Sequence, residues 1–375
     1  MNALEYAKSL VSFESPSYMT NLPVSDFVEQ QLASMGFTIE RIEFDDAAGV
    51  RKANIVAKKG EGLGGVAYFG HTDVVPADDW VSEQHGAFEP TVKDNKLFGR
   101  GSCDMKGSIA CMLAAAKRIS GSELKKPIYV TCTADEEVGY GGARQVCDRS
   151  TLYREMLEGE SHGIIGEPTM LEVVYAHKGT YGIVAKSHGR AAHSSTRAGL
   201  NANLAMIPFL SVMKQIHDET ESDTTWHNDK FDPPTLSWNI GVNDNTRAVN
   251  ITAPQSICTV YFRPMPGQDV EPLLERVEQA AQEHDIEVRI NRASGPLYTD
   301  PKCQYVAQVL GLVGKGLPRT VSYGTDGGVF SKMNNLVVFG PGDIAQAHTN
   351  NEWIAIEQLE LGTEMYSRLI RHWCC

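Results

Sequence analysis

The chain has 375 residues, a formal net charge of −13 at pH 7 and 42% hydrophobic residues. This length is sufficient for two domains with hydrophobic cores, and the composition is ordinary for a globular protein. No basic stripe is present to neutralise phosphates, and no apolar run is long enough to span a bilayer, so neither nucleic acid nor a membrane is expected as a partner.

The eight cysteines include no Cys-x-x-Cys pair. We expect reduced thiols packed in the core of a cytoplasmic protein, while a disulfide framework and a thiolate zinc site are the alternatives. Residues 1–8 have no secretory pattern, which also favours a cytoplasmic location.

The first candidate ligands follow an early strand. Helices are expected at 4–13 and 22–35 and strands at 38–44, 53–58 and 65–69. Gly70 ends the last of these strands, and His71 and Asp73 follow two positions apart. Residues i and i+2 point the same way, and ligands bind at the carboxyl edge of open α/β sheets. His71 is a candidate metal ligand oriented by the Asp73 carboxylate, and a structural histidine is the alternative.

A glycine-rich run at 98–107 is the second landmark. A helical pattern at 105–119 places Asp104 at a helix N-terminus, where it serves either as an N-cap or as a ligand. The run does not match a phosphate-binding Walker loop, because no Gly-Lys-Ser/Thr sequence closes it.

Three further strands deliver polar side chains at their ends. The strand at 127–134 is followed by three acids, which include Glu136 and Glu137; the strand at 163–166 is followed by Glu167; and the strand at 336–339 is followed by glycines and then His348. A run of acids is ordinarily a solvated loop. After a core strand, a bound cation would offset the repulsion between the carboxylates.

Residues 178–290 have a different pattern. Strands at 181–186, 235–242, 257–262 and 286–290 and helices at 200–216 and 270–284 predict an α+β domain inserted into the first one. Helices at 302–314 and 356–373 return the chain to the first domain. We therefore predict an α/β catalytic domain, with a mixed sheet and helices on both faces, from residues 1–177 and 291–375, and an inserted α+β domain from residues 178–290.

The strand and loop ends of the first domain together offer two histidines and three carboxylates as metal ligands. Mixed nitrogen and oxygen ligands suit Zn²⁺, and Co²⁺ or Mn²⁺ is also possible. These side chains are sufficient for two ions only if one carboxylate bridges them.

At this point the chain resembles the dizinc amidohydrolase and exopeptidase family of acetylornithine deacetylase, succinyl-diaminopimelate desuccinylase, aminoacylase and glutamate-type carboxypeptidases. The motifs GHTDVVP, GRGSCDMKG, TADEEVGYGG, IIGEPT, HGRAAHSS and the late AH occur in the family's order over nearly the whole length. The resemblance implies one zinc ion on His71 and Glu167, a second on Glu137 and His348, and Asp104 bridging both. It also implies that the Asp104–Met105 peptide bond is cis.

The resemblance also implies roles for other residues. Glu136 would be the general base, with Asp73 supporting His71. The inserted domain would be a ferredoxin-like lid and dimerisation domain, and its His193 would reach the partner subunit's site in a homodimer. Arg263 and Asn250 would contact the substrate.

The substrate is indicated by the segment 324–330. Val329 stands where the desuccinylase pattern has Arg, and Thr325 and Asp326 look more like the deacetylase branch. We therefore predict deacetylation of N-acetylornithine to ornithine and acetate, with Asp326 facing the distal ammonium or only shaping a turn.

Desuccinylase, aminoacylase and dipeptidase activities are the alternatives within the family. Outside it stand a non-catalytic binding protein on the same fold and a metal-free hydrolase that uses the carboxylates of Asp135 and Glu136.

Overall fold

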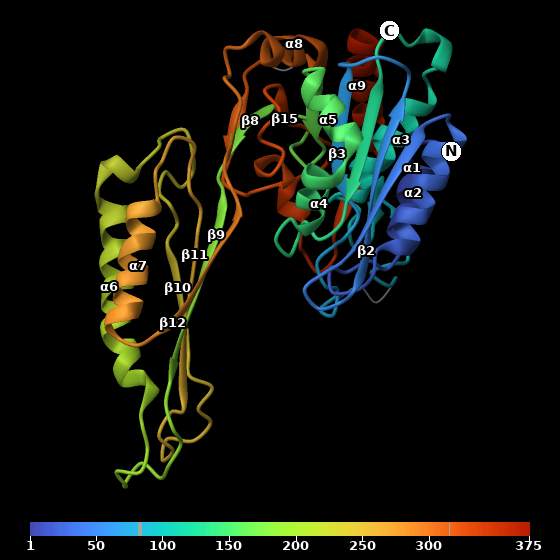
Figure 1. Cartoon of the computed structure of the whole chain (residues 1–375). Helices are drawn as coiled ribbons and strands as arrows, with labels where there is room; N and C mark the ends of the chain where they lie inside the picture. The colour runs from blue at the N-terminus through green and yellow to red at the C-terminus, as the bar shows by residue number, and fades with distance from the viewer. Residues whose placement is uncertain (82–84, 315) are drawn as a thin grey trace. The chain divides into compact units, whose positions relative to one another are not determined.

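The structure, a computed structural model, describes residues 1–81, 85–314 and 316–375. It contains two compact units (Figure 1). The first unit is formed by Met1–Ala176, Leu297–Arg319 and Thr325–Cys375, and the second by His177–Pro296 and Thr320–Gly324. The predicted α/β class, with one large mixed sheet, is confirmed.

A nine-stranded mixed sheet lies at the centre of the first unit, in the order β1-β2-β6-β3-β7-β15-β8-β13, with β14 beside β8. Its strands are β1 (Thr38–Asp45), β2 (Arg51–Lys59), β3 (Val66–His71), β6 (Ile128–Thr133), β7 (His162–Ile165), β8 (Val174–His177), β13 (Leu297–Tyr298), β14 (Arg319–Val321) and β15 (Leu336–Val338). Strand β3 pairs in parallel with both β6 and β7, and β15 pairs in parallel with β7. The carboxyl ends of these four strands therefore meet at one edge of the sheet.

Helices cover both faces of this sheet. One face carries α1 (Ala3–Val11), α2 (Leu22–Ser34), α3 (Lys106–Lys117), α8 (Gln304–Val313) and α9 (Ile356–Cys374), which share one hydrophobic core. The other face carries α4 (Gly141–Arg149) and α5 (Thr151–Glu158), two helices that the sequence pattern did not predict. Because both faces are covered, the central strands β3 and β6 are buried at every position and show no alternation of buried and exposed residues.

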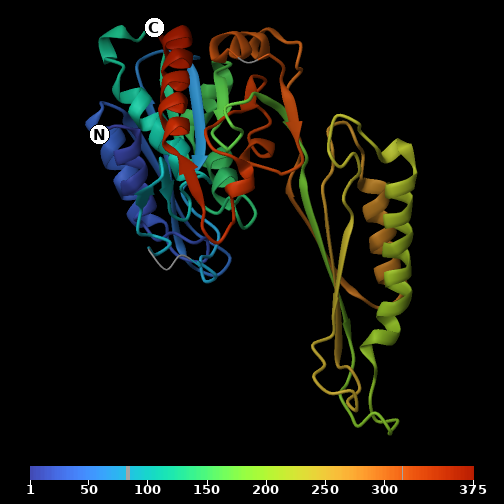
Figure 2. The same cartoon turned by 180° about the vertical axis from the view of Figure 1, so that it is seen from behind.

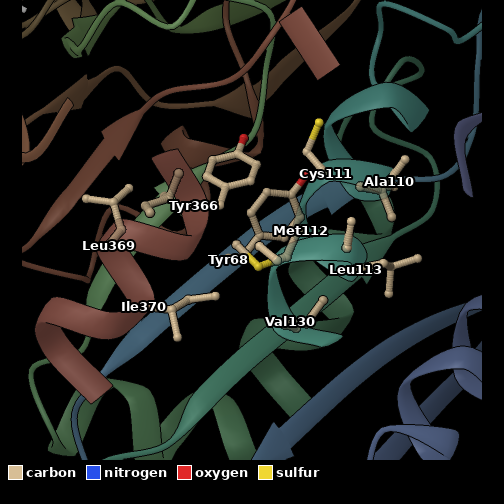
Figure 3. Close-up of a cluster of buried hydrophobic side chains, with 14 of the residues drawn as sticks. Tyr68, Ala110, Cys111, Met112, Leu113, Val130, Tyr366, Leu369 and Ile370 are labelled. Atoms are coloured by element: carbon tan, nitrogen blue, oxygen red, sulfur yellow. The ribbon is translucent and has the colours of Figure 1, made fainter. Parts of the chain in front are cut away.

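Strand β3 illustrates this double burial. Tyr68 points toward α3 and α9, and its ring centroid lies 5.5 Å from that of Tyr366 (Figure 3). The next residue, Phe69, points to the opposite face, where its ring lies 4.4 Å from Phe330 and 6.5 Å from Tyr153 of α5. The strand is thus held on both sides just before it ends at His71.

A small antiparallel sheet connects the glycine-rich run to the C-terminal region. It consists of β4 (Thr91–Lys93), β5 (Lys96–Phe98) and β16 (Trp353–Ala355) in the order β16-β5-β4. Phe98 pairs with Trp353, so the chain enters residues 99–104 from a strand whose partner follows the His348 loop.

The second unit is an antiparallel sheet, in the order β10-β11-β9-β12, with two helices on one face (Figure 2). Its elements are β9 (Thr180–His188), α6 (Ala202–Ser222), β10 (Asn239–Asn243), β11 (Gln255–Phe262), α7 (Glu271–Glu283) and β12 (Glu287–Ser294). The strand expected from residue 235 begins only at Asn239, because Ser237 has a φ of 55°, which regular strand geometry does not permit.

All eight cysteines are free, and five of them, Cys103, Cys111, Cys132, Cys258 and Cys374, are buried. Among the described residues, no helix combines the length and the apolar character needed to cross a membrane.

Candidate metal centre

The first group of ligands meets at the carboxyl edge of the central sheet. His71 ends β3, Glu167 follows β7 and Asp104 lies two residues before the start of α3. His71 Nε2 lies 3.1 Å from Asp104 Oδ1 and 3.6 Å from Glu167 Oε1. Parallel pairing of β3 with β7 brings the first two residues together, whereas Asp104 arrives from the glycine-rich run.

A second group shares Asp104. His348 Nε2 lies 3.4 Å from Asp104 Oδ2 and 3.1 Å from Glu137 Oε1. The two oxygens of Asp104 therefore face two different imidazoles. The side chain of His71 is 1% exposed and that of His348 is 54% exposed, so the second group opens to solvent.

The structure thus brings together all five side chains that the sequence predicted as ligands. The Asp104–Met105 peptide bond is cis, as expected. Two overlapping sets place one ligand atom from each residue within 4.8 Å of the others: His71 with Asp104 and Glu137, and His71 with Glu136 and Glu167. Imidazole and carboxylate donors at this spacing fit two divalent ions of the zinc type.

The electrostatics of the site show why it favours cations. Burial raises the pKa of Glu136 and of Glu167 well above the usual range, and the neighbouring carboxylates raise both further. Hydrogen bonds to Asp104 and Glu137 raise the pKa of His348 to about 10. In the metal-free protein, bound protons therefore reduce the repulsion between the carboxylates, as bound divalent ions would.

Metal binding is expected to release protons. An imidazole must be neutral to bind a metal ion, and His348 stays protonated in the metal-free protein until the pH approaches about 10. Metal affinity should therefore rise as pH increases from 6 to 8. At about pH 7.5, calorimetry in two buffers of different ionisation enthalpy should detect at least about one proton released. Heats that do not depend on the buffer would contradict this, and His348→Ala should release fewer protons.

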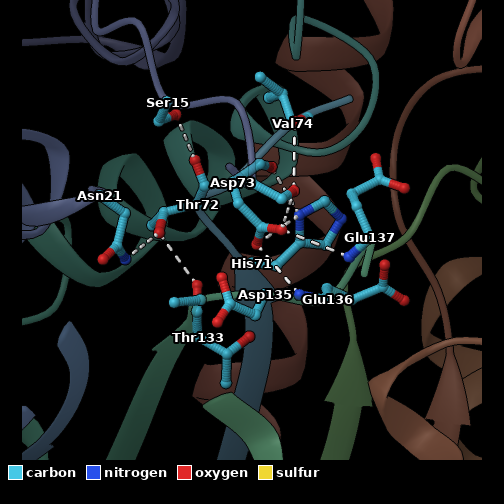
Figure 4. Close-up of polar contacts among 12 residues, drawn as sticks. Ser15, Asn21, His71, Thr72, Asp73, Val74, Thr133, Asp135, Glu136 and Glu137 are labelled. Atoms are coloured by element: carbon cyan, nitrogen blue, oxygen red, sulfur yellow. Dashed lines mark hydrogen bonds and ion pairs between the residues drawn. The ribbon is translucent and has the colours of Figure 1, made fainter. Parts of the chain in front are cut away.

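Asp73 supports the site in a way the sequence did not reveal (Figure 4). Its Oδ1 accepts the Glu136 N–H at 3.2 Å, and its Oδ2 accepts the Glu137 N–H at 3.3 Å and the Ser17 hydroxyl at 2.7 Å. His71 Nδ1 lies 2.9 Å from the main-chain carbonyl oxygen of Asp73 and 3.7 Å from its carboxylate. The carbonyl therefore orients His71, and the carboxylate mainly positions the segment that carries Glu136.

Two buried residues near the site escaped sequence analysis. Lys52 lies 2.8 Å from Asp135 and donates to the carbonyl oxygens of Ser17 and Met19. Glu352 accepts hydrogen bonds from the Asp104 loop. The sequence signals for these two residues were a lysine within an otherwise apolar strand and a glutamate four residues after His348.

The remaining predicted residues lie elsewhere. His193, Asn250 and Arg263 belong to the second unit. There, His193 Nδ1 accepts the Ser195 hydroxyl at 2.7 Å, the Asn250 carbonyl oxygen accepts the Ser194 N–H at 2.9 Å, and the Arg263 guanidinium lies 5.2 Å from the Tyr261 ring.

Thr325 and Asp326 are buried in the first unit. The Thr325 hydroxyl accepts the Gly327 N–H at 2.9 Å, and Asp326 Oδ2 accepts the Thr133 hydroxyl at 2.6 Å. The two residues are 0% and 2% exposed. Their contact with substrate therefore stays a prediction.

Comparison with known proteins agrees with this geometry. The family model described as Peptidase family M20/M25/M40 matches residues 67–372. The chain belongs to this family. Membership in M20/M25/M40 confirms the predicted resemblance and the prediction of a metal-dependent hydrolase.

Individual relatives cover the whole chain. Proteins named acetylornithine deacetylase from Myxococcus xanthus and Pasteurella multocida are 33% and 32% identical over 97% and 100% of this chain, and over 96% and 97% of their own lengths. An M20 family metallo-carboxypeptidase from Sulfolobus solfataricus has a TM-score of 0.77 at 15% identity, with 100% of this chain and 99% of that chain covered. The last comparison establishes that the M20 fold is shared.

Proposed function

We propose that the protein hydrolyses the amide bond of an N-acyl amino acid with two bound Zn²⁺ ions, and that its preferred substrate is N-acetylornithine. The observation that carries the proposal is the position of Asp104, whose two oxygens face His71 and His348 separately. The two relatives named acetylornithine deacetylase support the choice of substrate.

The protein's own residues divide the work between holding ions and moving a proton. Bound divalent ions would supply Lewis acidity for the amide carbonyl and for water. Glu136 is the general base: its carboxylate takes a proton from the attacking water and gives it to the amine nitrogen that leaves. Burial raises the pKa of Glu136, which suits a group that must hold this proton between the two steps. Asp73 holds the main chain of Glu136 in place.

The test is a substrate panel combined with metal removal. N-acetylornithine, N-succinyl-diaminopimelate, other N-acyl amino acids and dipeptides should be compared by kcat/KM. N-acetylornithine is expected to rank first, dialysis against a chelator to abolish activity, and Zn²⁺ or Co²⁺ to restore it. Activity that survives complete metal removal would refute the proposal, and preference for a succinyl substrate would move it to the desuccinylase branch.

The second unit carries the lid and dimerisation part of the proposal. In a homodimer, His193 would donate a hydrogen bond to the oxyanion in the partner's site, and Arg263 and Asn250 would bind the substrate carboxylate. Strand β10 is an edge of its sheet. A groove between β10 and α6 is lined by four apolar residues, Met206, Ile207, Leu210 and Val242, and by four polar ones, Asn203, Asn243, Asp244 and Ser256. A second copy of the chain would cover the edge strand and these apolar side chains.

Light scattering at micromolar concentration tests this arrangement. The protein is expected to be a dimer, and Ile207→Glu, which places a charge in the groove, should give monomers. If His193 acts in the partner's site, these monomers should also lose about 100-fold in kcat, as for the loss of one oxyanion donor. Leu317→Glu is the matched control, because Leu317 is 85% exposed in the first unit. A monomeric wild-type protein would contradict the proposal.

A further inference from the structure

The carboxylate of Glu352 accepts several hydrogen bonds from the loop that carries Asp104, and no role assigned above accounts for them. It is 1% exposed. Its Oε1 accepts the N–H groups of Cys103 at 2.8 Å and Asp104 at 3.0 Å. Its Oε2 accepts the Gly101 N–H at 2.9 Å and Arg100 Nη1 at 3.0 Å.

The main chain of Glu352 adds a fifth contact. Its carbonyl oxygen accepts the Gly99 N–H at 3.0 Å, which extends the pairing of Phe98 with Trp353 by one step. A single residue therefore receives the N–H groups of residues 99, 101, 103 and 104. This stretch of main chain belongs to no helix or strand, so it has no regular ladder to satisfy these donors.

Glycine at position 101 lets the loop adopt its conformation and pack tightly against Val74. Gly101 has a φ of 80°, and a Cβ atom there would lie 2.6 Å from Val74 Cγ1. Arg100 is itself 1% exposed, and its Nη2 donates to the Pro76 carbonyl oxygen at 3.2 Å. The positive charge of Arg100 makes burial of the Glu352 carboxylate possible.

Glu352 also belongs to the loop that carries His348. The loop 340–352 therefore supplies His348 to the second group. Through Glu352 it also accepts hydrogen bonds from the loop that carries Asp104, which is another ligand of that group. The first group receives His71 and Glu167 from β3 and β7, which the central sheet holds without help from Glu352. The two groups thus depend on Glu352 to different degrees.

We infer that Glu352 is a positioning residue that sets the distance between the Asp104 and His348 loops and so determines the affinity of the ion bound by Asp104, Glu137 and His348. This inference rests on the two-ion site of the proposed function. Loss of Glu352 releases four donors at once, so the Asp104 Oδ2 and His348 Nε2 atoms are no longer held at a common ion position. The ion bound by His71, Glu167 and Asp104 Oδ1 shares the disturbed Asp104 but retains its two sheet-held ligands, so its binding is weakened less.

The experiment is a titration of metal-free protein with Co²⁺, followed by calorimetry and by the cobalt absorption spectrum. Glu352→Gln replaces one accepting oxygen with an NH₂ group that faces N–H donors. Glu352→Gln is expected to weaken binding of the lower-affinity Co²⁺ equivalent about 10–100-fold, which is the range typical of residues that orient a metal ligand. The affinity for the higher-affinity equivalent should change by no more than about 3-fold.

Glu40→Gln is the matched control. The Glu40 carboxylate accepts the N–H groups of Thr151 and Leu152 and two hydroxyl groups at the start of α5, away from the ligands. Glu40→Gln loses the same kind of hydrogen bonds as Glu352→Gln and should bind both Co²⁺ equivalents with wild-type affinity. If Glu352→Gln fails to fold by circular dichroism, Glu352→Asp decides by the same criteria, because its shorter side chain cannot reach both pairs of donors.

Wild-type affinity for both equivalents, or an equal loss at both, would overturn the inference. A wild-type protein that binds fewer than two equivalents would instead refute the two-ion site, so the two failures are distinguishable.

Discussion

Glu136→Gln is expected to lower kcat by about 10³-fold, within the range known for removal of a general acid–base group. The amide keeps the size of the side chain but cannot take the proton from the attacking water. Because Glu136 lies near His71 and Glu167, metal content must be measured on the same sample. Both ions should remain bound, and KM should change less than kcat.

The control for this variant is Glu364→Gln, which changes an exposed carboxylate paired with Arg118 and Arg368. It should retain wild-type activity. Full metal occupancy with undiminished kcat in Glu136→Gln would exclude Glu136 as the base. The metal-free alternative, in which the carboxylates of Asp135 and Glu136 act together, would then be excluded as well. Glu136 would no longer be the base, and Asp135 is paired with Lys52.

Asp104→Ala is expected to weaken the binding of both ions, whereas His348→Ala is expected to weaken the binding of only one. Asp104 offers one oxygen to each imidazole, so its removal takes a ligand from both groups. We expect a loss of affinity above about 100-fold at each position, more than for residues that only orient a ligand. Hydrolysis should be lost with the ions.

Calorimetry on metal-free protein measures this contrast. In Asp104→Ala both binding steps should weaken, while His348→Ala should keep one step near the wild-type affinity, because His71 and Glu167 remain in place. If Asp104→Ala affected one step alone, Asp104 would bind a single ion. The bridging arrangement would then be wrong even if the protein proved to be a metal hydrolase.

The strand ends were predictable because the signals are local. An apolar run that stops at a glycine and is followed by His71 and Asp73 indicates a buried strand with polar side chains at its end. The same reasoning located Glu136, Glu137 and Glu167. Helices α4 and α5 were missed, because α4 begins with two glycines and both helices are short, at nine and eight residues, so that their formation depends on packing against the sheet.

Contacts across long sequence separations were not accessible in this way. Asp104 and Glu352 are 248 residues apart, and their hydrogen bond depends on β5 pairing with β16. The carboxylate of Asp73 turned out to hold the N–H groups of Glu136 and Glu137, at separations of 63 and 64 residues. A carboxylate shows in the sequence only that it can accept hydrogen bonds, and the donors it receives depend on which loops the fold brings to it.

The amino-acid order by itself determined which residue types stand at the ends of the buried strands, and therefore the chemistry available to the site, because burial and chain breaks depend on neighbouring residues. Only the tertiary structure decided that Asp104 offers one oxygen to His71 and the other to His348, and that Glu352 holds the loops that carry two of these residues. Strand pairing sets those distances, and pairing is a property of the whole sheet, which no single segment encodes.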